Sequence, residues 1–283
     1  MSAPANLLRR ICLPLLLMQF FYAGYATAET WKSLDNGLEL GTFQVNTASL
    51  FGHSEITVLR VDPKLWDIKL YSIQQFDYKK GITTKEWSNR HKLTAAINAG
   101  MHLPDMSTHV GYMQTGNTTQ GKKVKSYQSL AAFSPQTKNA VPFRIFDLDA
   151  ADTNFEQIKK DYFHVVQNLR LIKRPGENRW DKKSRRWNEA ALGEDKQGRA
   201  LLIYSSGLLT MHDFNETILS LPLDLVAAQH LEGGREAQLY INHPSFTKEL
   251  NNSIDPLYLS TNKNLGAWPI PNIIGVSKKE SSN

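Results

Sequence analysis

Cysteine is almost absent from this 283-residue chain, and that scarcity limits the folds open to it. The single cysteine, Cys12, lies in an apolar segment near the start of the sequence. The chain beyond that segment therefore has no disulfide framework, no thiolate ligands for zinc and no thiol nucleophile. Its stability must come from a buried core, and the stretch of about 255 residues after position 28 is long enough for one large domain.

The first 28 residues have the pattern of a signal peptide. Arg9 and Arg10 form a positive region, a mostly apolar run covers positions 11 to 25, and Ala26 and Ala28 supply the small residues that a signal peptidase recognises. We predict cleavage after Ala28, a mature domain over residues 29–283, and a periplasmic or secreted location.

An uncleaved membrane anchor is the alternative interpretation of this segment. Gln19, Gly24 and Tyr25 interrupt the apolar run, which is barely as long as the roughly 20 residues needed to span a bilayer. No later segment is as long and apolar, so we expect no stable membrane insertion after cleavage.

The charge of the chain is mildly basic, and the surplus is local. The formal net charge of +6 falls to about +4 without Arg9 and Arg10, because no acidic residue precedes Glu29. Seven cations lie between Lys173 and Arg186, which indicates either a solvated loop or an electropositive rim that attracts phosphate or an anionic glycan. No nucleic-acid-binding motif accompanies them, so no nucleic-acid partner is expected.

Short strand-like runs, rich in β-branched and aromatic residues, dominate the mature chain. Alternation predicts a hairpin of residues 56–61 and 66–74 around Asp62-Pro63, and further strands at 93–98, 163–172, 200–205 and 225–231. Thr83 and Glu86 form a capping box for a helix to about Lys92, and Asp213 with Glu216 predicts a second helix. We expect an α+β single domain with a mixed, largely antiparallel central sheet and a few flanking helices.

Five segments in chain order carry recognisable motifs. They are Asn98-Ala99-Gly100-Met101 with Asp105, Gly111 and Gly116-Asn117; Gln167 to Ile172; Glu189 to Gly193; Leu231-Glu232-Gly233-Gly234; and Pro271 to Val276. Together they resemble the phosphodiester glycosidase domain family over about residues 90 to 276. The resemblance implies hydrolysis of a sugar joined through its anomeric carbon to a phosphate.

This sequence departs from the family pattern at three positions. Glu232 stands where the family motif has an aspartate, Glu236 where it has a serine, and Glu189 where it has an arginine. The two additional carboxylates would repel a phosphate unless the basic stretch from Lys173 to Arg186 folds over them.

The residues around Glu232 also indicate a site without the resemblance. Gly233 and Gly234 follow the carboxylate at the end of a predicted strand and permit close approach of a ligand. His230 precedes it by two residues, so both side chains should point to one face. The alternative is that Gly233-Gly234 only makes a hairpin between residues 225–231 and 236–241.

A second group, His102, Asp105 and His109, lies in one loop after Asn98. The spacing offers two imidazoles and a carboxylate to a divalent metal, but Pro104 favours a fixed turn. We expect no metal and no cofactor, and interpret the loop as lining a substrate site.

These patterns predict an exported glycosidase-type hydrolase that acts on a carbohydrate or glycosyl-phosphate ligand. Glu232 is the expected base or nucleophile, with Glu189 and His230 as further candidates for proton transfer. Substrate contacts are expected from Asn98, Gly100, His102, Asp105, Gln167, Arg170, Gly233 and Gly234. The alternatives are a catalytically silent glycan-binding or polysaccharide-export accessory protein of the same fold, and a cation-dependent nuclease or phosphatase.

Overall fold

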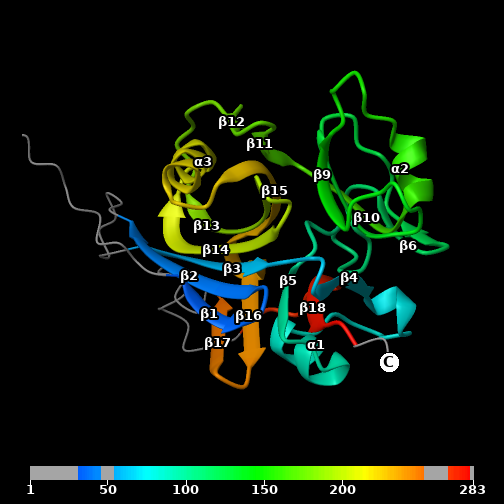
Figure 1. Ribbon diagram of the computed structural model, residues 1–283, viewed down its shortest axis with the longest axis horizontal. Coiled ribbons are helices and arrows are strands. Elements are labelled where there is room, and N and C mark those ends of the chain that lie inside the picture. The colour runs from blue at the N-terminus through cyan, green and yellow to red at the C-terminus, as the bar shows by residue number, and fades with distance from the viewer. Residues whose placement is uncertain (1–30, 46–53, 252–266, 281–283) are drawn as a thin grey trace, which may run out of the picture.

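The structure, a computed structural model, describes residues 31–45, 54–251 and 267–280 (Figure 1). Its strands form three sheets, and every pairing among the described strands is antiparallel. Three α-helices accompany the sheets in this part of the chain. The predicted α+β class is confirmed, and the strands are divided among three sheets rather than gathered in one central sheet.

The first sheet has eight strands in the order β1-β2-β3-β14-β13-β15-β11-β12. Their bounds are β1 Lys32–Asp35, β2 Leu38–Val45, β3 Ser54–Val61, β11 Arg170–Lys173, β12 Glu177–Asn178, β13 Trp187–Asp195, β14 Ala200–Leu209 and β15 Leu225–Gly233.

Two five-stranded sheets complete the fold. The order β17-β16-β5-β18-β4 joins Phe246–Asn251, Gln238–His243, Ala95–Asn98, Asn272–Lys278 and Trp66–Ser72. The order β7-β6-β10-β8-β9 joins Thr118–Gln120, Met113–Thr115, Tyr162–Asn168, Ser129–Pro135 and Phe143–Asp147.

The helices begin at side-chain caps. The predicted capping box of Thr83 and Glu86 opens α1 (Thr84–His91), which Lys92 ends in a left-handed conformation. Asn154 caps α2 (Phe155–Asp161). The second predicted helix is also present as α3 (Met211–Ser220), but its cap is Thr210, whose hydroxyl accepts from the Asp213 amide.

One large apolar core connects the three sheets. Leu59 and Leu231 enter it from the first sheet, Ile97 and Ile274 from the second, and Phe133 from the third. All five side chains are buried almost completely. Since burial of apolar area is the main stabilising term in folding, this shared core accounts for a chain without cross-links.

The predicted hairpin around Asp62-Pro63 is wrong. Strand β3 pairs with β2 and β14 in the first sheet, whereas β4 pairs with β18 in another sheet. A turn is present, with the Trp66 amide donating to the Asp62 carbonyl at 3.0 Å, but the chain leaves it into a different sheet.

Candidate active site

Glu232 lies where the chain passes from one sheet to another. Strand β15 ends at Gly233, a short 3-10 helix covers Gly234–Glu236, and β16 then pairs with β5 and β17 in the second sheet. Gly234 has a φ of 75°, a left-handed value that glycine adopts without strain. The alternative of a hairpin between residues 225–231 and 236–241 is therefore wrong, and the two glycines connect sheets.

A β-bulge precedes this connection. Ala190 on β13 faces Glu232 and the next residue, Ala191, faces His230, so Leu231 is an additional residue on β15. Leu231 is fully buried in the large core. Bulges are common at sheet edges, at barrel rims and next to active sites, where they redirect side chains or end the pairing of strands.

Glu189 and His230 form a buried pair across β13 and β15. The Nδ1 atom of His230 contacts the Oε1 atom of Glu189 in a very short hydrogen bond, and the two residues are 1% and 5% exposed. Burial raises the pKa of Glu189, although His230 acts against the shift. Burial alone lowers the pKa of His230, but the carboxylate of Glu189 outweighs it and the net shift is upward.

Trp187 holds the far side of this pair. Its indole Nε1 donates to the Oε2 atom of Glu189 at 2.8 Å. The same ring lies against the backbone of Gly233, where a Cβ would come within 2.4 Å of the Trp187 Cδ1 atom. Glycine at 233 therefore lets the tryptophan approach and links Glu189 sterically to the Glu232 turn.

Glu232 itself is half-buried, and the pKa of its carboxyl group is far above the ordinary value for glutamate. Burial raises its pKa to about 7, against the opposing effects of the charge on His230 and of the Gly233 amide, which donates to Glu232 at 3.0 Å. A carboxyl group with a pKa near neutrality can accept or release a proton under physiological conditions.

Asn98 fixes the chain after Glu232. Its Nδ2 donates to the Glu236 carbonyl at 2.5 Å, and its Oδ1 accepts from the Gln238 amide at 2.7 Å. Because both ends of the side-chain amide are used by backbone groups, Asn98 positions the turn.

Unpaired polar atoms occur on three residues in the segments that meet near Gly100, just beyond Asn98. The buried atoms Nε2 of His102, Nδ1 of His109 and Oδ1 of Asn168 have no hydrogen-bond partner. A Cβ at Gly100, whose φ is 142°, would lie 2.1 Å from the Asn168 Oδ1. Buried polar atoms are nearly always paired in proteins, so the unpaired ones in these segments mark places where a water molecule or a polar ligand can bind.

Hydrogen bonds connect this group to the acidic residues. Asn168 Nδ2 donates to the Ala99 carbonyl at 2.9 Å, and the His230 amide donates to the Leu169 carbonyl at 2.9 Å. His102 is also close enough to Glu232 to lower the pKa of that carboxyl group. The structure thus brings together four predicted segments, which contain Asn98, Asn168, Glu189 and Glu232.

Gln167 is fully buried beside them, and its amide is occupied by the backbone. It accepts from the amides of Tyr112 and Val124 and donates to the carbonyls of Val124 and Tyr127, at 2.7–3.2 Å. This geometry differs from the expected substrate contact and makes Gln167 a support for the 124–127 loop. That loop carries Tyr127, a neighbour of Glu232 that sequence reasoning missed. Burial and the charge of Glu232 raise the pKa of Tyr127.

Arg170 is also engaged by the protein itself. Its guanidinium group binds Asp149 at 2.6 Å and Asp147 at 3.1 Å. The expected role in anion contact is at odds with these two ion pairs. Arg170 instead ties β11 to the end of β9.

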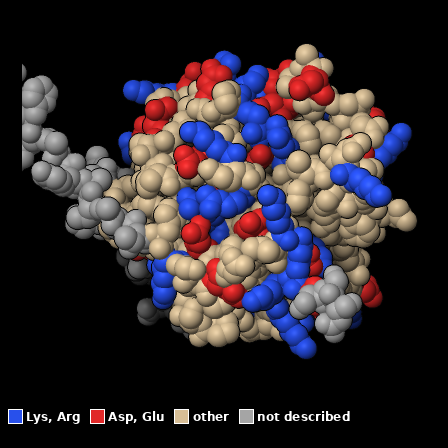
Figure 2. Space-filling view, in the orientation of Figure 1, with Lys and Arg blue, Asp and Glu red and all other residues tan. Residues whose placement is uncertain are grey.

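The basic segment after Arg170 has acidic partners as well. Four ion pairs join Lys173 to Asp149, Arg174 to Glu194, Arg179 to Glu177 and Arg186 to Asp213. Figure 2 shows the two signs of charge interspersed on the face in view. The segment is thus partly neutralised, which weakens the expected electropositive rim.

Asp105 is exposed and satisfied within its own turn. Its carboxylate accepts from the Ser107 and Thr108 amides at 2.9 Å each and from the Thr108 hydroxyl at 2.6 Å. These bonds lower its pKa to about 2. Within the described ranges, no three His, Cys, Asp or Glu side chains are grouped as metal ligands.

Comparison with known proteins connects this geometry to a family. The family model for phosphodiester glycosidase matches residues 91–277, well over half of the chain. The chain belongs to the phosphodiester glycosidase family. A search of curated proteins finds no match to it.

Two solved structures are similar in fold to this phosphodiester glycosidase family member. One is the catalytic domain of zebrafish N-acetylglucosamine-1-phosphodiester alpha-N-acetylglucosaminidase, auto-inhibited by its pro-peptide. It has a TM-score of 0.62 and 13% sequence identity, and the match covers 88% of this chain and 86% of that one. A hypothetical protein from Synechocystis has a TM-score of 0.56 and 13% identity, over 90% of this chain and 65% of its own.

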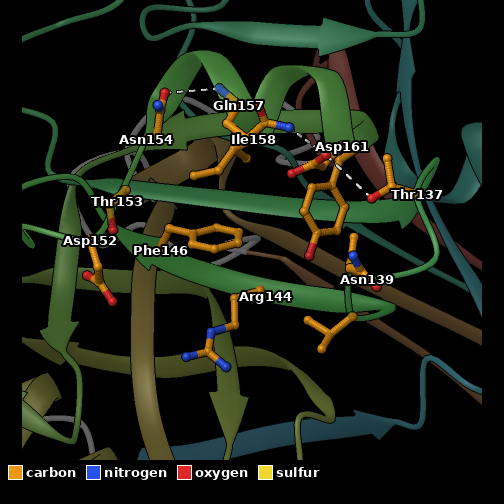
Figure 3. A pocket seen from close by; sticks show the side chains of 13 residues that line it. Thr137, Asn139, Arg144, Phe146, Asp152, Thr153, Asn154, Gln157, Ile158 and Asp161 are labelled. Atoms are coloured by element: carbon orange, nitrogen blue, oxygen red, sulfur yellow. Dashed lines mark hydrogen bonds between the residues drawn. The ribbon is translucent and has the colours of Figure 1, made fainter.

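A hollow of about 590 Å³ lies away from the candidate site, against α2 and β9 (Figure 3). Several of its polar side chains serve α2 itself. Asn154 caps the helix, and Asp161 accepts from Gln157 and Thr137, as the dashed lines in Figure 3 mark. None of the expected site residues lines it.

The predicted signal peptide lies outside the described residues. In the part of the chain that the structure describes, no helix has the length and apolar character needed to cross a membrane.

Proposed function

We propose that this chain is an exported hydrolase that cleaves the bond between a sugar and a phosphate in a glycosyl phosphodiester, with Glu232 as its working carboxylate. Membership of the phosphodiester glycosidase family supports the reaction class. The observation that carries the proposal is the meeting of half-buried Glu232 with the buried Glu189–His230 pair at the connection between two sheets.

The reaction uses Glu232 as a general base. Water attacks the anomeric carbon, the bond from that carbon to the phosphate oxygen breaks, and the water proton passes to Glu232. The products are the free sugar and a phosphate monoester. Phosphate leaves readily without protonation, so the site needs no strong general acid, and one carboxylate is sufficient.

The Glu189–His230 pair tunes that carboxylate. The positive charge on His230 favours the ionised form of Glu232, whereas burial favours the protonated form. The balance keeps Glu232 close to the midpoint of its titration at neutral pH. His230 and Glu189 are therefore positioning residues that set the charge of the base.

In this proposal the substrate binds beside the carboxyl group of Glu232 and the loop that follows Gly100. The unpaired Nε2 atom of His102, on a half-buried side chain of that loop, supplies a hydrogen bond to a sugar hydroxyl. Arg235 lies three residues after Glu232, with its guanidinium 4.6 Å from the centre of the Trp268 ring, and we assign it a contact with the phosphate because of this position in the turn.

A catalytically silent glycan-binding protein is the second candidate. The ion pairs that engage Lys173, Arg174, Arg179 and Arg186 favour it, because they reduce the positive charge available to a phosphate. Binding of glycan without turnover separates this candidate from the hydrolase.

The deciding experiment measures hydrolysis of a panel of glycosyl phosphodiesters by the parent and by Glu232→Gln. Loss of the base should lower kcat by about 10²–10⁴-fold while the melting temperature changes little. Glu249→Gln is the control, since Glu249 forms a surface ion pair with Lys85. Full turnover by Glu232→Gln, or no turnover by the parent together with glycan binding, would refute the hydrolase proposal.

Glu232→Asp tests the departure from the family motif. It restores the expected residue type with a side chain one methylene shorter. A gain of activity would indicate that the site still accepts the aspartate of the family motif and that glutamate lowers its activity. A loss would indicate that the rest of the site is adapted to the longer side chain.

Export is tested separately by N-terminal sequencing of the protein recovered from the periplasm or medium. We expect the sequence to start at Glu29, after cleavage at Ala28. A protein that retains Met1, or that stays in the cytoplasm, would contradict the proposed export.

A further inference from the structure

A second hollow, of about 430 Å³, lies between β4 and the ends of β6, β8 and β10. It shares no residue with the Glu232 site. Its lining combines aromatic rings with polar side chains, among them Lys69, Tyr71, Phe76, Phe163 and His164.

Phe76 forms one wall, and it is held rigidly although it is exposed. It is 39% exposed, but its ring stacks on Tyr71 with centroids 6.1 Å apart and an interplanar angle of 16°. The His91 ring lies 4.4 Å away and Trp87 completes the contact. An exposed ring fixed by neighbouring rings loses little conformational entropy when a ligand binds.

Phe163 also lines the hollow, and the backbone fixes it. It is 41% exposed and lies against Gly116, where a Cβ would come within 2.6 Å of the Phe163 Cζ atom. Gly116 has a φ of 56°, and its amide donates to the Phe163 carbonyl at 2.8 Å. Glycine at this turn therefore leaves room for the phenyl ring.

His164 contributes a polar group that the protein leaves unused. The residue is only 4% exposed, lines the hollow, and its Nδ1 atom has no hydrogen-bond partner. Burial, together with the positive charge of Lys69, lowers the pKa of His164 to about 3. The imidazole is therefore neutral at physiological pH, and its Nδ1 atom can donate or accept one hydrogen bond with an uncharged ligand.

Lys69 does not make the hollow a site for anions. Its ammonium group binds Asp67 at 2.8 Å, so the nearest cation is paired with an acid. An uncharged ligand with apolar faces and polar edges matches this combination of rings and hydrogen-bonding groups.

From this geometry we infer that the hollow bounded by Phe76, Phe163 and His164 is a secondary binding site for a neutral sugar ring of a glycan chain. The carbon–hydrogen face of a pyranose packs on the aromatic rings, and its hydroxyls bond to His164 and the other polar groups of the rim. The site holds the polymer on the protein and does no chemistry.

The experiment uses the mature chain with Glu232→Gln, so that no turnover disturbs binding, and titrates it with neutral malto-, cello- and chito-oligosaccharides. Binding is followed by NMR, including the imidazole nitrogens of His164. We expect at least one series to bind with a Kd on the order of 1 mM and to shift the His164 signals. Phe76→Ser and Phe163→Ser should each weaken that binding about fivefold, which is about 1 kcal/mol at 1.4 kcal/mol per tenfold.

Leu208→Ser is the matched control, since Leu208 is 37% exposed but lies on β14 outside the hollow, and it should leave the affinity unchanged. His164→Gln tests the polar contact, and the signals of Phe76 and Phe163 report binding if that variant folds poorly. The inference is overturned if no oligosaccharide shifts His164, or if both Phe variants bind as the parent does. Because only binding is measured, these outcomes are independent of whether Glu232 catalyses hydrolysis.

Discussion

Glu189 and His230 face each other from neighbouring strands, β13 and β15, as an acid and a base that are both almost completely withdrawn from water. Removing water strengthens their attraction but makes either charge costly without the other. The pair therefore acts as one unit, and its net effect on Glu232 depends on both members being present.

The first prediction concerns this unit. Trp187→Phe removes the hydrogen bond to Glu189 while keeping a ring against Gly233. That bond lowers the pKa of Glu189, so its loss should weaken the carboxylate charge, lower the pKa of His230 and raise that of Glu232. The midpoint of the pH profile of kcat/KM should move to higher pH.

The control for this prediction is Trp180→Phe. The indole of Trp180 makes a comparable hydrogen bond, at 2.6 Å, to the carbonyl of Arg170, outside the acidic pair. Its loss should reduce stability without moving the pH profile. Equal shifts in both variants would show that the pair has no special effect on the base.

The second prediction is the pH dependence of activity. A base with a pKa of about 7 becomes competent as it loses its proton, so kcat/KM should rise through about pH 7 and then level off. An activity that instead falls through pH 7 would assign Glu232 the role of an acid.

Stability should change in the opposite direction over the same range. The pKa of Glu232 is raised in the folded state, so the folded protein binds this proton more tightly than the unfolded chain. Its contribution to the free energy of unfolding is complete below about pH 4.3 and is lost as the pH rises through about 7. Urea unfolding of the parent and Glu232→Gln across this range measures the difference.

The third prediction tests the crowding at Gly100. Gly100→Ala would place a methyl group on the Asn168 oxygen and against the His109 ring, in a backbone conformation that alanine disfavours. We expect the free energy of unfolding to fall by more than about 2 kcal/mol. Gly198→Ala isolates the backbone part, because Gly198 has a φ of 77° and no atom within 4 Å of its Cβ position. Similar losses in both variants would show that the contact with Asn168 is unimportant.

The fourth prediction concerns Arg235. If its guanidinium contacts phosphate, Arg235→Gln should raise KM for a glycosyl phosphodiester by about tenfold or more, as expected when a charged hydrogen bond is lost. Arg90→Gln is the comparison, since Arg90 also lies over an aromatic ring, that of Tyr78 at 5.0 Å, but on α1 outside the candidate site. An unchanged KM in the Arg235 variant would mean that a different cation contacts the phosphate.

Local patterns predicted the elements of this fold better than their partners. The hydroxyl and carboxylate of Thr83 and Glu86 act within one turn, so their spacing is sufficient to predict the start of α1. Alternation identified β3 and β4 equally well, but it contains no information on the sheet that each joins. The partner of β4 is β18, near the other end of the chain.

The same limit applies to the site. The motifs that contain Asn98, Glu189 and Glu232 are far apart in the sequence, and the structure brings their segments into contact. The side-chain partners of Gln167 and Arg170 could not be read from the sequence. A sequence does not distinguish a side chain that contacts a ligand from one that contacts the protein. Here the Gln167 amide binds backbone groups, and the Arg170 guanidinium binds two aspartates.

The turn that follows Glu232 is anchored at both ends, in one sheet by β15 and in the other by β16, and Asn98 binds it on both sides of Ala237. Most loops near active sites tolerate insertions because their interiors make few contacts with the rest of the protein. Here only four residues separate β15 from β16 and Asn98 holds the Glu236 carbonyl, so an added residue would disturb a strand register or a bond of Asn98. A change of specificity at this turn is therefore expected from replaced side chains at positions 232 to 236 rather than from a change in its length.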